Sequence, residues 1–198
     1  MTGVLESVSR ETRERLELYH AVLLKWSPQI NLVSRSTLEE AWTRHFVDSA
    51  QILSLAEPPV QSWLDLGSGG GFPGLVVAIM MAESEPGARV TLMESDQRKC
   101  VFLRTVLREV GVSATVLNSR IEKADPVGAT VISARALAPL ATLLSFAKRH
   151  GAPGSVALFP KGRSWEEEIA AARTEWRFKH TVHRSNTDGE AVILRIEE

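Results

Sequence analysis

The stretch from Trp63 to Gly74, W-L-D-L-G-S-G-G-G-F-P-G, combines residue types that can bind a nucleotide-like ligand. Its apolar start predicts a strand, Asp65 supplies a carboxylate, and glycines follow at positions 67, 69, 70, 71 and 74. Glycine tolerates positive φ and has no Cβ, so the backbone of such a turn can approach a bound molecule closely. Pro73 suits the first turn of a helix, because its missing N–H would have no partner there. The stretch therefore predicts a strand, a binding turn and a helix N-terminus in succession.

Two cofactor classes compete for this turn. Gly69, Gly71 and Gly74 match the G-x-G-x-x-G spacing of dinucleotide folds. The strand, however, reaches Gly67 first, which places Asp65 two residues before the first glycine. A carboxylate at that point would repel a pyrophosphate but would attract a cation. The arrangement resembles motif I of class I methyltransferases that use S-adenosylmethionine, whose sulfur is positively charged and which carries no phosphate.

Glu94 ends the next expected strand, Arg89 to Glu94, where its carboxylate can accept hydrogen bonds from both hydroxyls of a ribose. The plainer interpretation of Asp65 and Glu94 is helix capping or turn formation at strand ends. The glycine-rich turn between them favours the ligand-binding interpretation.

The composition of the chain indicates which kind of protein must position these residues. The chain has 198 residues, 44% of them hydrophobic and 24% charged, which predicts a globular protein with one full core and a small extension. A formal net charge of −1 gives no general sign of nucleic-acid binding, so any RNA contact must come from a local patch. We find no signal peptide and no apolar run long enough to span a membrane, and we therefore expect a cytoplasmic protein.

Cysteine and histidine usage argues against a metal site. Cys100 is the single cysteine, which excludes an internal disulfide and a cysteine cluster, and the histidines show no ligand spacing. Cys100 itself is expected to be a small core residue.

The prolines of Glu57-Pro58-Pro59 divide the chain into an N-terminal helical extension, 1–57, and a core, 58–198. Leu16, Tyr19, Leu23 and Trp26 recur at helical spacing, which predicts one amphipathic helix packed against the core. A second helix is expected over Leu38 to Leu55, with Ser36 or Thr37 as its N-cap.

Beyond residue 58, strand and helix patterns alternate, which predicts a mostly parallel sheet with helices on both faces. Strands are expected near 62–67, 89–94, 114–118, 129–133 and 155–160, and helices near 73–83, 97–110, 139–149 and 164–175. Phe178–His183 and Ala191–Ile196 flank an N-T-D-G turn, which predicts a hairpin and hence an antiparallel last strand. The expected fold class is α/β, a Rossmann-like class I methyltransferase sheet with an N-terminal helical extension.

Further segments resemble the RsmG (GidB) family of 16S rRNA guanine-N7 methyltransferases over nearly the whole chain. The segments are Lys25-Trp26 with Asn31-Leu32, Arg44-His45-Phe46-Val47-Asp48-Ser49, Gly71-Phe72-Pro73-Gly74, Glu94-Ser95 with Lys99 and Phe102-Leu103, Arg120-Ile121-Glu122, Ser133-Ala134-Arg135-Ala136 and Lys161-Gly162. Two departures leave the RNA contacts open: Ala134 stands where the family often has serine, and Gln97-Arg98-Lys99 replaces a common Lys-Lys pair.

The resemblance implies a function and a set of site residues. It implies methyl transfer from S-adenosylmethionine to N7 of a guanine in 16S rRNA, with that RNA or the small ribosomal subunit as partner and without metal or membrane. It places Arg135 in the catalytic site. Together with the motif reasoning, the expected cofactor-binding residues are Asp65, Gly67, Gly69, Gly71, Phe72, Glu94, Ile121, Glu122 and Arg135.

The chemistry of the acceptor agrees with what the sequence lacks. Guanine N7 has an exposed lone pair, so it can attack a sulfonium methyl without a general base, and alignment becomes the enzyme's main task. The Asn-Pro-Pro-Tyr or Asp-Pro-Pro-Tyr segment typical of exocyclic-amine methyltransferases does not follow the fourth strand, and no cysteine pair suits C5 methylation.

Several alternatives stay open from sequence. The acceptor could be another RNA, a small molecule or a protein, or the chain could bind S-adenosylmethionine without catalysis. His45 could face RNA or be a structural histidine, and Asp48 is expected to pair locally or to cap backbone rather than to act on substrate. A basic strip beside the cofactor site could be formed by Arg35, Arg44, Arg98, Lys99, Arg135, Lys161 and Arg163.

Overall fold

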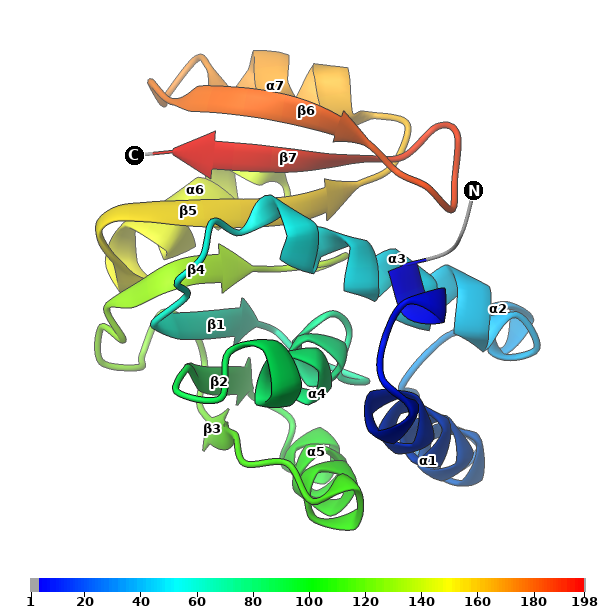
Figure 1. Ribbon diagram of the computed structural model, residues 1–198. Helices are drawn as coiled ribbons and strands as arrows, with labels where there is room; N and C mark the ends of the chain where they lie inside the picture. The colour runs from blue at the N-terminus through cyan, green and yellow to red at the C-terminus, as the bar shows by residue number, and fades with distance from the viewer. Residues whose placement is uncertain (1–3, 198) are drawn as a thin grey trace.

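The computed structural model describes residues 4–197, which form a seven-stranded sheet with helices on both faces (Figure 1). The strands are β1 (Ser62–Leu66), β2 (Arg89–Glu94), β3 (Thr115–Asn118), β4 (Ala129–Ser133), β5 (Gly151–Lys161), β6 (Lys179–Arg184) and β7 (Val192–Glu197). Their order is β3-β2-β1-β4-β5-β7-β6. The first five strands are parallel, and β7 pairs antiparallel with both β5 and β6. The expected sheet with its antiparallel last strand is confirmed.

The helices of the core follow the expected alternation. They are α4 (Gly74–Ser84), α5 (Gln97–Val110), α6 (Leu140–His150) and α7 (Trp165–Ala172). In Figure 1, α4 and α5 cover one face of the sheet and α6 and α7 the other. β5 begins at Gly151, four residues before the expected start at 155, and α7 ends at Ala172 rather than 175.

Local sequence explains where α5 begins and ends. Asp96 caps its N-terminus, because the Asp96 carboxylate accepts hydrogen bonds from the backbone N–H groups of Arg98 and Lys99. The helix ends at Gly111, whose φ of 66° is the left-handed conformation that terminates helices. These two signals set the length of α5, the helix that connects β2 to the edge strand β3.

The N-terminal extension contains a short 3-10 turn, η1 (Val4–Glu6), and the helix α1 (Arg10–Trp26). The expected stripe on α1 is confirmed, since Leu16, Tyr19 and Leu23 have no exposed surface. The stripe belongs to the same hydrophobic cluster as Trp63 of β1. The extension therefore completes one face of the core, and its separation at residue 57 as a domain stays a prediction.

The expectation of a single helix over 38–55 is wrong. The segment is divided into α2 (Arg35–Leu38), a π-helical turn η2 (Trp42–Val47), α3 (Asp48–Ala50) and a 3-10 turn η3 (Gln51–Leu55). Ser34, not Ser36 or Thr37, is the N-cap residue of α2. Trp42 and Phe46, four residues apart in this segment, stack with ring centroids 5.1 Å apart, and Phe46 also packs against Tyr19 of α1 at 4.7 Å. Such π-helical turns within helical segments are frequent at functional sites.

Among residues 4–197, no helix combines the length and the apolar composition needed to cross a membrane. Within the same residues, no group of three His, Cys, Asp or Glu side chains is placed to hold a metal ion. Cys100 is buried and unpaired by disulfide, as expected of a core residue.

Candidate functional site

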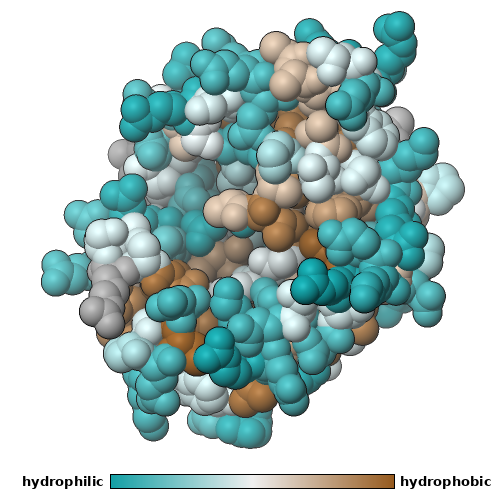
Figure 2. Space-filling view, turned by 180° about the vertical axis from the view of Figure 1, so that it is seen from behind, coloured by the Kyte–Doolittle hydropathy of each residue, from teal (hydrophilic) through white to brown (hydrophobic). Residues whose placement is uncertain are grey.

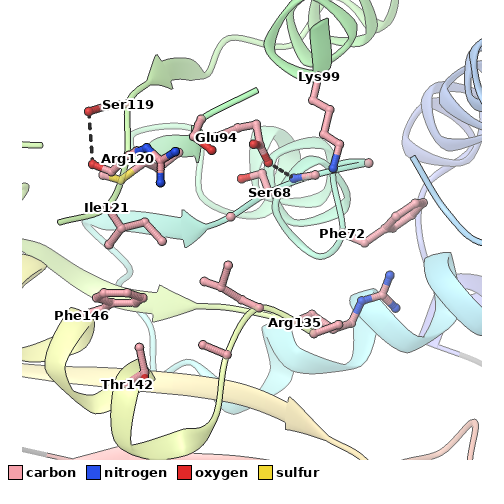
Figure 3. Close-up of a pocket in the computed structure, with 18 of the residues that line it drawn as sticks. Ser68, Phe72, Glu94, Lys99, Ser119, Arg120, Ile121, Arg135, Thr142 and Phe146 are labelled. Carbon is pink, nitrogen blue, oxygen red and sulfur yellow. Dashed lines mark hydrogen bonds between the residues drawn. The ribbon is translucent and has the colours of Figure 1, made fainter. Parts of the chain in front are cut away.

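A cavity of about 560 Å³ lies at the carboxyl ends of β1, β2 and β4, where ligands bind in parallel sheets (Figure 3). Ile121 and Phe146 lie at one end of this cavity, and Phe72 and Arg135 lie at the other. Figure 2 shows the molecule from the face that carries α6 and α7, with a hollow left of centre whose surroundings are both hydrophilic and hydrophobic. We call the space in Figure 3 the first cavity.

Backbone from the glycine-rich turn forms one wall of the first cavity. Gly67 has a φ of 62°, and a Cβ on it would lie 2.6 Å from Leu137 Cδ1. Gly71 has a φ of 93°, and a Cβ there would collide with the side chain of Leu75 and lie 2.7 Å from the hydroxyl of Tyr19. The turn is also held from outside, because the Tyr19 hydroxyl donates a 2.5 Å hydrogen bond to the carbonyl of Gly70. Glycine is therefore required by conformation and by space together.

Glu94 ties the turn to the next strand. One carboxylate oxygen accepts from the N–H of Gly69 at 2.9 Å, and the other accepts from the N–H of Asp96 at 2.8 Å. A carboxylate can accept about four hydrogen bonds, so two acceptor positions remain for a ligand. Only 8% of Glu94 is exposed, and the carboxylate lines the first cavity.

Asp65 lies behind the turn rather than in the cavity wall. Its Oδ1 accepts a 2.6 Å hydrogen bond from Ser133, whose own hydroxyl oxygen accepts from the indole N–H of Trp63 at 2.9 Å. Its Oδ2 is buried and has no hydrogen-bond partner among residues 4–197. Burial is the main cause that raises the pKa of Asp65 to about 6, against the hydrogen bond from Ser133, which lowers it. The carboxyl is thus a buried group with unused acceptor capacity beneath the binding turn.

A short turn between β3 and β4 supplies the apolar end of the first cavity. Ile121 is 8% exposed, and the turn that carries it is fixed from the C-terminal end of α6. There the His150 ring is 2.9 Å from the carbonyl of Ile121, and Arg149 donates to the carbonyl of Ala124 at 2.7 Å. Phe146 on the same helix faces Ile121 (Figure 3). A flat aromatic ligand group would find apolar contacts at this end.

Arg135 dominates the opposite end. Its guanidinium lies over the ring of Phe72, 5.2 Å from the centroid, which is a cation–π distance. Nη1 donates to the Asp48 carboxylate and to the carbonyl of Arg44, both at 3.2 Å. Nη2 lies 3.0 Å from Nδ1 of His45. Three segments that are distant in sequence therefore meet at this side chain.

The backbone next to Arg135 is strained. Ala136 has a φ of 51°, and it is the one non-glycine residue with positive φ in the described part of the chain. This conformation costs a residue with a Cβ about 1 kcal/mol. Such strain persists where the surrounding structure fixes it, commonly at functional sites.

His45 is held neutral at this end of the site. Burial first, and the nearby charge of Arg135 second, lower the pKa of His45 to about 4. A neutral ring can accept at Nδ1 from Arg135 and donate from Nε2 to the Thr37 hydroxyl, 2.9 Å away. Both ring nitrogens are therefore engaged.

A second cavity, of about 1060 Å³, adjoins the first. Its walls come from the extension, including Trp42 and Thr43, and from the β6–β7 turn, including Thr187 and Gly189. Leu32, Arg135 and Ala136 line both cavities. Arg135 is thus a shared wall, with a smaller pocket on one side and a wider groove on the other.

Seven of the residues expected from sequence to bind a cofactor line the first cavity: Gly67, Gly69, Phe72, Glu94, Ile121, Glu122 and Arg135. Asp65 and Gly71 do not, because Asp65 is fully buried and Gly71 points toward Leu75 and Tyr19. Further lining residues were not foreseen: Ser68, Ser119, Leu137, Thr142 and Phe146. Thr142 and Phe146 are four residues apart on one helical face, and this spacing is the signal that could have pointed to them.

The expected basic strip is only partly formed. Lys99 and Arg135 line the first cavity and Arg44 lines the second. The Lys161 side chain is 8% exposed and pairs with Glu168 at 2.7 Å, so it cannot belong to a surface strip. The side chain of Arg35 lies outside the described part of the structure.

Asp48 also differs in part from expectation. It accepts locally from Gln51, at 2.8 Å, but it also pairs with Arg135, 87 residues further along the chain. The local pairing was foreseen, and the distant one was not.

The donor set of the first cavity fits a ligand with charges of both signs. Its wall carries two carboxylates, Glu94 and Glu122, and three cations, Lys99, Arg120 and Arg135. S-adenosylmethionine has a cationic sulfur, an amino group, a carboxylate, a ribose and an adenine. The apolar end, the free acceptor positions on Glu94 and the glycine backbone each match a part of that molecule.

Comparison with known proteins gives consistent results. A family model described as rRNA small subunit methyltransferase G matches residues 12–193. A ribosomal RNA small subunit methyltransferase G from Ruegeria sp. (strain TM1040) is 54% identical over 196 residues, which is 98% of this chain and 95% of that protein. A protein of the same name from Paracoccus denitrificans (strain Pd 1222) is 47% identical over 191 residues, 96% of each chain.

Among solved structures, a SAM-dependent methyltransferase from Aquifex aeolicus superposes with a TM-score of 0.62 at 14% identity, covering 90% of this chain and 97% of that one. At this identity the similarity concerns the fold, and it confirms the expected class.

Proposed function

Because the chain belongs to the rRNA small subunit methyltransferase G family, we propose that it transfers the methyl group of S-adenosylmethionine to N7 of a guanine in 16S rRNA. The partner is that RNA or the small ribosomal subunit, and the reaction takes place in the cytoplasm, where ribosomes are assembled. Two features of the chain support this assignment: the composition of the first cavity, and the position of Arg135 between the two cavities.

The first cavity is the proposed cofactor site. The backbone at Gly67 and Gly69, the carboxylate of Glu94 and the side chain of Ile121 would hold the cofactor there. When bound, S-adenosylmethionine supplies a methyl group on a positively charged sulfur. The buried carboxyl of Asp65, whose Oδ2 has no partner among residues 4–197, supplies negative potential from beneath the turn. That potential suits a cation and disfavours a pyrophosphate.

The polar groups around Arg135 support an acceptor that needs no deprotonation. Both nitrogens of His45 are engaged, one with Arg135 and one with Thr37, so the ring is not free to act as a base. Guanine N7 attacks through its own lone pair. The protein's contribution is then to hold the base in line with the methyl group and to exclude water, which can account for several kcal/mol of a barrier.

Arg135 is the observation that carries the proposal. It lines the cofactor cavity and the wider groove at once, which is where a group that orients an acceptor against a methyl donor must lie. Its planar guanidinium has five N–H donors, and Nη1 and Nη2 already hold it in one plane over Phe72. In this position it orients the acceptor base at the mouth of the cofactor site.

The proposal is tested by incubating the purified protein with S-adenosylmethionine and either naked 16S rRNA or small subunits from cells that lack this protein. Mapping N7-methylguanosine by chemical cleavage is expected to find a single modified guanine in one of these substrates. Arg135→Ala is expected to lower the signal at least about 100-fold while cofactor binding is largely kept. Absence of N7-methylguanosine from both substrates, despite cofactor binding, would contradict the proposed acceptor.

The alternative is a methyltransferase for another RNA, a small molecule or a protein. The resulting methylated product distinguishes it, since labelled methyl groups would then appear in that acceptor and not in 16S rRNA. A steep fall of substrate binding with salt concentration is expected for RNA and not for a small neutral acceptor. Tight binding of NAD without a response to S-adenosylmethionine would instead favour the dinucleotide interpretation of the glycine turn.

A further inference from the structure

A hydrogen-bonded cluster joins three distant segments beside the site. We call it the Asp48 cluster, and it consists of Asp48, Gln51, Arg135, Ser185 and Thr187. Oδ1 of Asp48 accepts three hydrogen bonds, from Thr187 at 2.7 Å, from Gln51 at 2.8 Å and from Ser185 at 3.4 Å. Oδ2 of the same carboxylate accepts from Nη1 of Arg135 at 3.2 Å. One oxygen is therefore held by the extension and the β6–β7 turn, and the other faces the site.

The cluster extends into the backbone of the turn. The N–H of Asn186 donates to Oε1 of Gln51 at 2.9 Å, and Nε2 of Gln51 donates to Ser185 at 3.1 Å. Gln51 is 4% exposed, and the side chains of Asp48 and Arg135 are each 17% exposed. Polar groups at this depth are costly unless they are satisfied, and a satisfied network rigidifies its members. The turn thus fixes Asp48 in one position.

Asp48 in turn limits the freedom of Arg135. A free arginine side chain has about 2 kcal/mol of rotamer entropy, which it must lose to act in one geometry. Here Nη1 is held by Asp48 and the carbonyl of Arg44, Nη2 by His45, and the guanidinium face by Phe72. Of these partners, Asp48 is the only one that contributes a full negative charge. Asp48 is also the only one of these partners that is hydrogen-bonded to the β6–β7 turn.

We propose that Asp48 is a positioning residue for methyl transfer, and that it acts through Arg135 and is itself set by the β6–β7 turn. The proposal rests on the proposed function, because the step that Arg135 serves is the alignment of an acceptor with the methyl donor. Asp48 does not touch the reacting atoms. Asp48 holds Arg135 in one rotamer before the substrate binds, so the entropy cost of ordering Arg135 does not add to the barrier of methyl transfer.

A double-mutant cycle on the full chain tests this. Asp48→Asn keeps the shape and removes the charge, and it is expected to lower kcat on the RNA substrate by about tenfold to 100-fold, as small misplacements do. Cofactor affinity, measured by calorimetry, is expected to change less than about twofold, because Asp48 does not line the first cavity. In an Arg135→Ala background, Asp48→Asn is expected to cause no further loss of kcat.

An equal loss of kcat in both backgrounds would overturn the proposal, because Asp48 would then act independently of Arg135. So would a loss that follows cofactor affinity or melting temperature. Asp48→Glu is expected to restore part of kcat, since it returns the charge at a longer reach.

A milder variant tests the same proposal in case Asp48→Asn does not fold. Thr187→Val removes one donor to Asp48 and keeps the side-chain volume, so kcat is expected to fall about threefold to tenfold. The matched control is Thr174→Val, because exposed Thr174 donates only to the carbonyl of Ala171 in its own turn. Equal activity of the Thr187 and Thr174 variants would remove the turn from the proposal.

A readout without any acceptor separates this inference from the proposed function. NMR signals of the Arg135 guanidinium, assigned by their loss in Arg135→Ala, are expected to show restricted rotation in the unmodified protein. In Asp48→Asn they are expected to average. If the protein fails to methylate 16S rRNA, the proposed function fails, while the NMR comparison still decides whether Asp48 orders Arg135. Unchanged spectra in Asp48→Asn would refute that ordering.

Discussion

The two ends of the functional site are built in different ways. The glycine-turn wall is one contiguous segment that is shaped largely by its own backbone: the Gly71 N–H donates to the carbonyl of Ser68, and the Ser68 hydroxyl donates to the carbonyl of Asp65. Tyr19 and Glu94 add hydrogen bonds to this segment from outside. The Arg135 wall is assembled from side chains 87 to 139 residues apart, as the contacts from Asp48 to Arg135 and to Thr187 demonstrate. The first wall depends on backbone conformation and the second on tertiary assembly. A substitution should therefore damage the first mainly through stability and the second mainly through activity.

The largest expected effect concerns Gly71. Gly71→Ala places a Cβ against Leu75 and Tyr19 at a φ of 93°. Left-handed backbone and overpacking together are expected to lower the free energy of unfolding by about 4 kcal/mol, measured by urea denaturation.

Gly69→Ala is the matched control, because its φ is 54° but its nearest atom would be 3.7 Å away. Only the conformational cost of about 1 kcal/mol is expected there. Equal losses in the two variants would mean that space does not constrain Gly71.

This difference also explains what sequence could predict. The glycine turn, the position of Glu94 at a strand end and the alternation of strands and helices are encoded by contiguous patterns, and the structure contains them as expected. The contact of Asp48 with Thr187 spans 139 residues and has no local signal. The division of the 38–55 segment into α, π and 3-10 turns likewise has no signal in hydrophobic periodicity, and the contact of Phe46 with Tyr19 joins two separate helical segments.

Asp65 shows that a sequence motif does not predict which way a side chain faces. Motif reasoning selects the carboxylate that precedes the glycines, but it does not distinguish a carboxylate facing the ligand from one buried behind the turn. The deciding factor is Ser133 on the neighbouring strand, which donates to Asp65 and itself accepts from the indole N–H of Trp63. Such partners become visible only when the strand order and register are known.

The second prediction uses the buried carboxyl of Asp65. Its pKa is about 6 in the folded chain against an ordinary value of 3.8, so the folded chain binds the proton more tightly than the unfolded chain does. The stabilisation from this group is fully present below about pH 4 and is lost as the pH rises through 6, by about 3 kcal/mol in all. Unfolding measurements between pH 4 and 7 are expected to show this loss relative to Asp65→Asn. Parallel pH profiles in the two proteins would contradict it.

Asp65 also links stability to cofactor binding. A bound cation favours the ionised carboxyl, so affinity for S-adenosylmethionine is expected to rise with pH through about 6. The rise is expected to be absent in Asp65→Asn. If both proteins bind with the same pH dependence, Asp65 has a structural role only, and the glycine-turn wall recognises its ligand without this charge.

The third prediction concerns the assembled wall. Arg135→Ala is expected to lower kcat/KM for RNA methylation at least about 100-fold, because orientation of the acceptor is lost. The free energy of unfolding is expected to fall by less than in Gly71→Ala, because the Asp48 oxygen that loses Arg135 lies in a side chain that keeps 17% of its surface exposed. The control is Arg108→Ala, whose guanidinium is exposed and pairs only with its neighbour Glu109. Full activity of Arg135→Ala would remove its assigned role.

The smallest expected effect tests the apolar end of the first cavity. Ile121→Ala removes methyl and methylene groups that would contact the adenine, which corresponds to about 1 kcal/mol and a roughly fivefold weaker cofactor affinity. The matched control is Val127→Ala, because Val127 is 36% exposed and does not line the cavity. Titration calorimetry distinguishes the two. The Ile121 backbone is held by His150 regardless of its side chain, so an unchanged affinity would mean that this end, like the glycine turn, recognises its ligand through backbone alone.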